Sequence, residues 1–112
     1  MKQLVVQIQP DLIPGVDEEA LCRELEEFAV ASPYVKSQSI TSGEDNGRYI
    51  NLSFSADRVG SFWNALRAAF FVRDDVMTPL ASASIVTCEG RSGWDDYLLL
   101  HHFDGREKLD LL

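Results

Sequence analysis

The chain is poor in cysteine, in basic residues and in long apolar stretches, and each scarcity excludes a class of protein. Its two cysteines in 112 residues are far from the disulfide-dense pattern of small secreted domains. No apolar run approaches the roughly 20 residues that a membrane-spanning helix needs. The chain has ten Lys and Arg residues and 18 Asp and Glu residues, which gives a net charge of −8. We therefore expect no nucleic-acid or membrane partner, because both require a basic surface, and we expect a protein partner with a basic surface instead.

Recognisable catalytic and metal-binding motifs are also missing. The sequence has no glycine-rich phosphate loop, no paired-cysteine zinc spacing, no histidines at i and i+4 and no Gly-x-Ser-x-Gly. The acidic pairs Asp74-Asp75 and Asp95-Asp96 lack the alternating oxygen ligands of a calcium loop. We predict no metal, no cofactor and no catalytic residue, and we favour a protein that is not an enzyme.

The composition is that of an ordinary globular protein, with 46% hydrophobic and 25% charged residues. A chain of this length forms one core, so we predict a single domain over residues 1–112. The apolar N-terminal run is interrupted by Gln7, Gln9 and Pro10 and is too short and too polar for a signal peptide. Cys22 and Cys88 each lie inside a predicted element and are interpreted as reduced, Cys22 as a small core residue, and the protein is interpreted as cytoplasmic.

Alternating apolar and polar residues predict a sheet organised around residues 48–55. Ile50, Leu52 and Phe54 share one face of this stretch, and Asn46-Gly47 before it is a hairpin signal. Residues 4–9 and 81–89 predict two more strands. Residues 34–41 predict a weaker strand of the kind found at a sheet edge.

Apolar residues at helical spacing predict two helices. The first covers residues 18–31, with Asp17 as its N-cap and Ser32-Pro33 at its end. The second covers residues 57–72 and begins at Asp57. Trp63 lies off the centre of the apolar stripe of this helix, so the pattern leaves open whether it packs in the core or in a partner interface.

The segment after Gly90 has two interpretations. Residues 92–95 resemble a helix capping box, whereas residues 97–103 resemble a buried strand that pairs with residues 81–89. We favour the strand. The order of elements then predicts an α+β, ferredoxin-like βαββαβ antiparallel sheet with two helices on one face and an additional C-terminal strand or short helix. The predicted core is apolar and comes from strands and helices together: Leu4, Val6, Ile8, Leu21, Leu25, Phe28, Ile50, Leu52, Phe54, Phe62, Leu66 and Phe70.

The segment Trp94-Asp95-Asp96-Tyr97 carries the main functional prediction. Two aromatic side chains flank two carboxylates, and this combination anchors a partner that presents Arg or Lys. With Trp63 and the net charge of −8, it predicts a protein-binding module in the manner of immunity proteins and inhibitors that neutralise toxins or nucleases. The pattern is equally compatible with Trp94 closing the core beneath the loop.

His101 and His102 carry the alternative, a small ferredoxin-like enzyme or ligand sensor. They are the only histidines of the chain, and histidine is the side chain that exchanges a proton near neutral pH. Adjacent residues of a strand point to opposite faces, so these two are not expected to bind one metal ion together. The sequence does not predict the oligomeric state.

Overall fold

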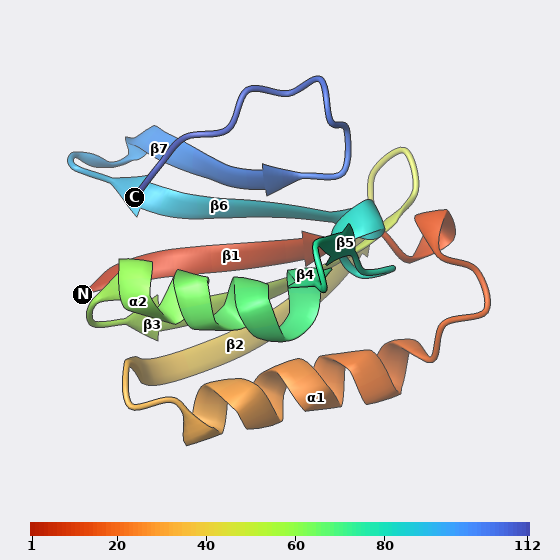
Figure 1. Cartoon of the computed structure of the whole chain (residues 1–112), viewed down its shortest axis with the longest axis horizontal. Helices are drawn as coiled ribbons and strands as arrows, with labels where there is room; N and C mark the ends of the chain where they lie inside the picture. The colour runs from red at the N-terminus through yellow and green to blue at the C-terminus, as the bar shows by residue number, and fades with distance from the viewer.

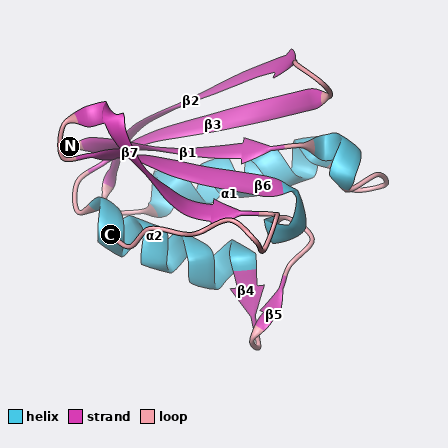
Figure 2. Cartoon of the chain, turned by 90° about the horizontal axis from the view of Figure 1, so that it is seen from above, coloured by secondary structure: helices cyan, strands magenta, loops and turns pink.

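A five-stranded sheet and two helices form the computed structural model, which describes residues 1–112 (Figure 1). The sheet is antiparallel throughout and has the order β2-β3-β1-β6-β7. Its strands are β1 (Lys2–Ile8), β2 (Val35–Glu44), β3 (Arg48–Ala56), β6 (Ser84–Gly90) and β7 (Gly93–His102). The helices α1 (Glu18–Ala31) and α2 (Val59–Leu66) cover one face of the sheet (Figure 2). The α+β class, the antiparallel sheet and the strand interpretation of the C-terminal segment are confirmed.

The strand order differs from that of a four-stranded βαββαβ sheet. β7 is added outside β6, and a hairpin of β4 (Val72–Arg73) and β5 (Val76–Met77) lies between α2 and β6. The sequence indicated only a loop there. The turn residues Asp74 and Asp75 have φ angles of 51° and 62°, a conformation that Asp tolerates better than most residues. The hairpin projects away from the sheet (Figure 2).

Helix α1 begins and ends where its sequence predicts. The Asp17 side chain accepts a hydrogen bond of 3.1 Å from the Ala20 N–H, and the helix stops at Ala31 before Ser32-Pro33. The predicted Asp57 cap of α2 is wrong, because Arg58 adopts φ 49° directly before the helix and no side chain caps it. Asp57 instead lies 3.8 Å from Lys36 Nζ.

Helix α2 is shorter than predicted because it continues into a π-helical turn, η2 (Arg67–Phe71). A π turn holds one more residue than an α turn, so Phe71 falls where Phe70 was expected. Phe71 is fully buried, whereas Phe70 packs edge-on against Phe28 of α1 at 5.3 Å between ring centroids. The added residue therefore exchanges the roles of two neighbouring aromatic side chains.

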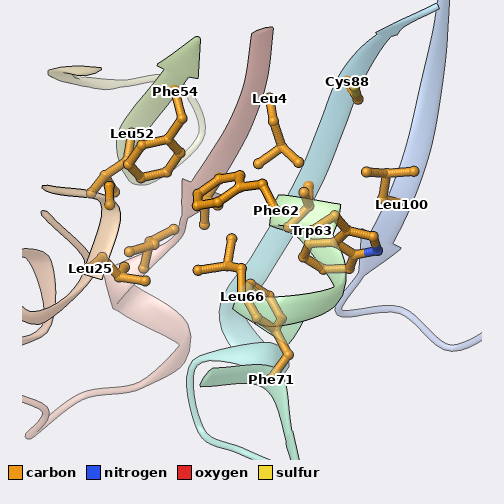
Figure 3. Close-up of a cluster of buried hydrophobic side chains, with 14 of the residues drawn as sticks. Leu4, Leu25, Leu52, Phe54, Phe62, Trp63, Leu66, Phe71, Cys88 and Leu100 are labelled. Atoms are coloured by element: carbon orange, nitrogen blue, oxygen red, sulfur yellow. The ribbon is translucent and has the colours of Figure 1, made fainter. Parts of the chain in front are cut away.

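The core lies between the inner face of the sheet and the two helices (Figure 3). Most of the predicted core residues are buried, while Leu21, Phe28 and Phe70 are partly buried and pack against the edge of the cluster. Other members come from α2, η2, β6 and β7, and the sequence had not assigned them to the core: Trp63, Phe71, Val86, Cys88 and Leu100. Neither helix has the length and apolar character that crossing a membrane requires.

Two short 3-10 turns complete the chain. The first, η1 (Pro10–Leu12), follows β1 and begins at Pro10. The second, η3 (Ala81–Ala83), occupies the start of the segment predicted as a strand, so β6 begins at Ser84. The connection between β2 and β3 is a three-residue loop, Asp45–Gly47, in which Asn46 and Gly47 both have positive φ.

Candidate functional site

Residues 94–97 form a bulge at the edge of the sheet. Gly90 pairs with Gly93 and Cys88 pairs with Leu98, so four residues of β7 lie opposite the single residue Glu89 of β6. Surplus residues in one strand of a pair break the ladder and bend the strand. Gly90 permits the close approach of the two strands here, since a Cβ atom at this position would overlap the carbonyl oxygen of Asp96.

The side chains of this bulge reach solvent. Trp94 is 41% exposed and Tyr97 is 56% exposed, and both Asp95 and Asp96 are exposed. Trp94 therefore does not close the core. Asp96 also stabilises the turn before the bulge, because its Oδ1 accepts a hydrogen bond of 2.8 Å from the Ser92 N–H. Neither carboxylate belongs to an ion pair of the chain.

Trp63, the fifth residue predicted to bind a partner, is separate from the bulge. It is 7% exposed and its ring packs edge-on against Phe71 at 5.2 Å. Figure 3 shows its indole between α2 and the β7 residue Leu100. Of the two alternatives that the sequence left open for Trp63, the structure shows packing in the core, beside Leu100 of β7.

A second irregularity in β7 directs His101 inward. Val86 pairs with His101 and Thr87 with Leu99, so Leu100 is an extra residue and both Leu100 and His101 are buried. His101 Nε2 lies 2.7 Å from the carbonyl oxygen of Ala81. Burial lowers the pKa of His101. The neutral ring therefore donates a hydrogen bond to that carbonyl from Nε2.

His102 points the other way, as predicted for adjacent residues of a strand. Its Nδ1 accepts a hydrogen bond of 2.9 Å from the Asp104 N–H, and its ring lies 4.6 Å from that of Phe103. The two histidines thus share no site. No group of three or more His, Cys, Asp or Glu side chains lies close enough together to hold a metal ion.

The two thiols lie in the interior. Cys22 and Cys88 are both free and buried. Burial is the main cause that raises the pKa of each thiol; nearby Glu side chains act in the same direction, and Lys2 opposes them at Cys88. Both cysteines therefore remain protonated near neutral pH, and they pack as small apolar residues.

A polar hollow of about 300 Å³ on the open face of the sheet was not predicted. It lies beside the Asp45–Gly47 loop and is lined by amide side chains of Gln7, Gln9 and Asn51. The Gln9 amide donates to Gln7 Oε1 at 3.5 Å, while Asn51 Oδ1 is buried without a partner. Strand alternation places the residues of β1 and β3 in this hollow on the face opposite the core, and the Asp45–Gly47 loop beside them becomes visible only in the structure.

Comparison with known proteins assigns no role to these residues: the chain matches no family model, no curated protein and no solved structure.

Proposed function

We propose that this protein is a small acidic binding module that occupies a basic surface of a protein partner through the bulge at residues 94–97. The observation that carries the proposal is the exposure of Trp94 and Tyr97 on either side of two carboxylates without ion-pair partners. Aromatic anchors supply much of the binding free energy of an interface, and carboxylates select partners that carry Arg or Lys.

The overall charge supports the same partner. A net charge of −8 on a chain of 112 residues attracts a positive cleft over a distance and speeds encounter. An immunity or inhibitor protein that neutralises a basic toxin or nuclease in the cytoplasm needs this negative charge and an exposed site of aromatic and acidic residues. The alternative, an enzyme or ligand sensor that uses His101 and His102, is less favoured because His101 is buried and hydrogen-bonded to Ala81.

We also infer that the fold is a variant of the ferredoxin-like arrangement. The order β2-β3-β1-β6 supports this inference, with α1 and α2 as the two connections across one face. β7 is then the addition that makes the order differ. The proposed site lies on this added strand, and binding would therefore not require any change in the other four strands.

The test is a pull-down from the native host followed by association kinetics at two ionic strengths. Trp94→Ala should raise the dissociation rate by about tenfold or more and leave the association rate unchanged. The paired substitutions Asp95→Asn and Asp96→Asn should lower the association rate, and added salt should lower it for the unaltered chain. The amide introduced by Asp96→Asn retains an acceptor oxygen for the Ser92 N–H, so the turn should persist.

The matched control removes the same two charges elsewhere, through Asp74→Asn and Asp75→Asn in the β4–β5 turn. Asn tolerates the positive φ of these positions about as well as Asp does. An acidic partner, or an association rate that responds equally to the two pairs of substitutions, would contradict the proposal. Thermal melting of each variant shows whether the fold is retained.

A further inference from the structure

The two edges of the sheet differ in how they are covered. Beyond β7, the C-terminal tail returns along the strand (Figure 1). The Asp110 N–H donates to the Leu99 carbonyl at 2.7 Å, and Asp110 Oδ2 accepts from the Leu99 N–H at 2.8 Å. The two irregularities in β7 interrupt any further pairing along this edge. This edge is therefore blocked to another strand.

The opposite edge, β2, pairs with β3 and with no other strand. Residues 37–43 of this ten-residue strand contain no proline and no charged residue, and the one break in register lies before them, between Val35 and Ser37. Charges, proline and bulges are the usual devices that prevent an edge from pairing with another chain. Ile40, in the middle of the stretch, is 47% exposed. The edge is open along its centre.

We propose that β2 pairs with β2 of a second copy of this chain, so that one antiparallel sheet runs through both. A two-fold axis at Ile40 sets the register, because Lys36 and Glu44 lie four residues before and after it. In that register Ile40 meets its own counterpart, and Lys36 of each chain faces Glu44 of the partner subunit. A register shifted along the strand loses both ion pairs and the Ile40 contact.

The side chains at this edge are available for such a contact. Ile40 and Glu44 are separated by an even number of residues and lie on one face of the strand. Lys36 is the unpaired residue at the break in register between Val35 and Ser37, and in the proposed dimer its long, flexible side chain reaches Glu44 of the partner subunit from there. Lys36 Nζ lies 3.8 Å from Asp57 Oδ2, and each of these two side chains is about half exposed. This ion pair therefore contributes little to the stability of the chain, and Lys36 can exchange it for another partner. Glu44 belongs to no ion pair within the chain.

Net charge makes the register matter. Two chains of −8 repel one another, and the two Lys36–Glu44 pairs supply attraction where the strands meet. Registers without these pairs retain the backbone hydrogen bonds and the repulsion but lose this attraction. The β2 edge thus selects a second copy of this chain through charge as well as through its open backbone groups.

The test is sedimentation equilibrium of the full chain from micromolar to millimolar concentration near physiological ionic strength. The unaltered chain should show a monomer–dimer equilibrium. Lys36→Glu and Glu44→Lys should each weaken it by about tenfold or more, and the double variant should restore it. Glu44→Lys changes the net charge from −8 to −6 (−8 + 2), which lowers the overall repulsion, so a weaker dimer would identify the local pair.

Lys108→Glu is the matched control, since it makes the same charge change in the exposed tail as Lys36→Glu makes in β2. The proposal is overturned if the unaltered chain remains monomeric at the highest concentration. It is equally overturned if Lys36→Glu weakens the dimer no more than Lys108→Glu does, or if the double variant fails to recover.

Crosslinking tests the register separately. In the proposed pairing, Ile40→Cys places two thiols directly opposite each other, within the Cα separation of roughly 4.4–6.8 Å that a disulfide spans. Ser42→Cys is an exposed control whose two copies would lie roughly 13 Å apart along the strands. Mild oxidation should crosslink the first variant and not the second, because the native thiols are buried. Equal crosslinking of both variants would refute the register.

Discussion

His101 should make the stability of the protein depend on pH in a direction that its surroundings determine. Its ring is 7% exposed, lies 5.0 Å from the Phe71 ring and bonds to the carbonyl of Ala81. Burial lowers its pKa below the ordinary value of 6.5; His102 and Arg67 lower it further, and the hydrogen bond to Ala81 opposes them. Protonation of the folded state is therefore disfavoured.

The sign of the effect follows from the two states. Below pH 6.5 the unfolded chain binds a proton at this histidine, whereas the folded protein does so only at a lower pH. The contribution of His101 to stability is thus fully present above the unfolded pKa and is lost as the pH falls toward the folded pKa. One such group changes the free energy of unfolding by at most about 1.4 kcal/mol between about pH 7.5 and about pH 5.5.

The assay is urea denaturation at these two pH values for the unaltered chain and for His101→Gln. Glutamine does not titrate, and its amide N–H can still donate to the Ala81 carbonyl. When the pH falls from the higher to the lower of these values, we expect the free energy of unfolding to decrease by up to about 1.4 kcal/mol more for the unaltered chain than for the variant. The carboxylates and His102 are common to both proteins and cancel in the difference. An equal loss in both proteins, or a His101 resonance that titrates at pH 6.5 or above, would refute the reasoning.

Three substitutions test the packing and the turns by chemical denaturation. Leu52→Ala removes a 1% exposed side chain from β3 and should cost about 2–5 kcal/mol; a loss below about 1 kcal/mol would contradict the described core. Gly47→Val should cost about 1–3 kcal/mol because Gly47 has φ 127°, whereas Gly105→Val, in a tail position with no neighbour within 4 Å, should change stability by less than about 0.5 kcal/mol. Gly90→Ala should cost about 1–3 kcal/mol, since the added Cβ overlaps the Asp96 carbonyl oxygen; an unchanged midpoint would show that β6 and β7 can move apart there.

Local sequence determines the parts of the fold that depend on spacing alone. The alternation of Ile50, Leu52 and Phe54 predicts the buried face of β3, which lies fully within the core. Asp17 and Ser32-Pro33 predict both ends of α1, because a capping oxygen and a proline act on backbone groups within a few residues. The residue types of the Trp94–Tyr97 segment made it a candidate site, but they left open whether Trp94 closes the core, and only the structure shows Trp94 to be 41% exposed.

Only tertiary structure decides the features that depend on how two elements meet. The π turn at Arg67–Phe71 places Phe71 rather than Phe70 in the core. The pairing of β7 with β6 sends Leu100 and His101 inward together and pushes residues 94–97 outward. The packing of Trp63 of α2 beside Leu100 of β7 places Trp63 in the core. Each of these outcomes depends on the element that packs against the residue across the sheet or helix. That packing partner sets the register, and residue periodicity does not specify the partner.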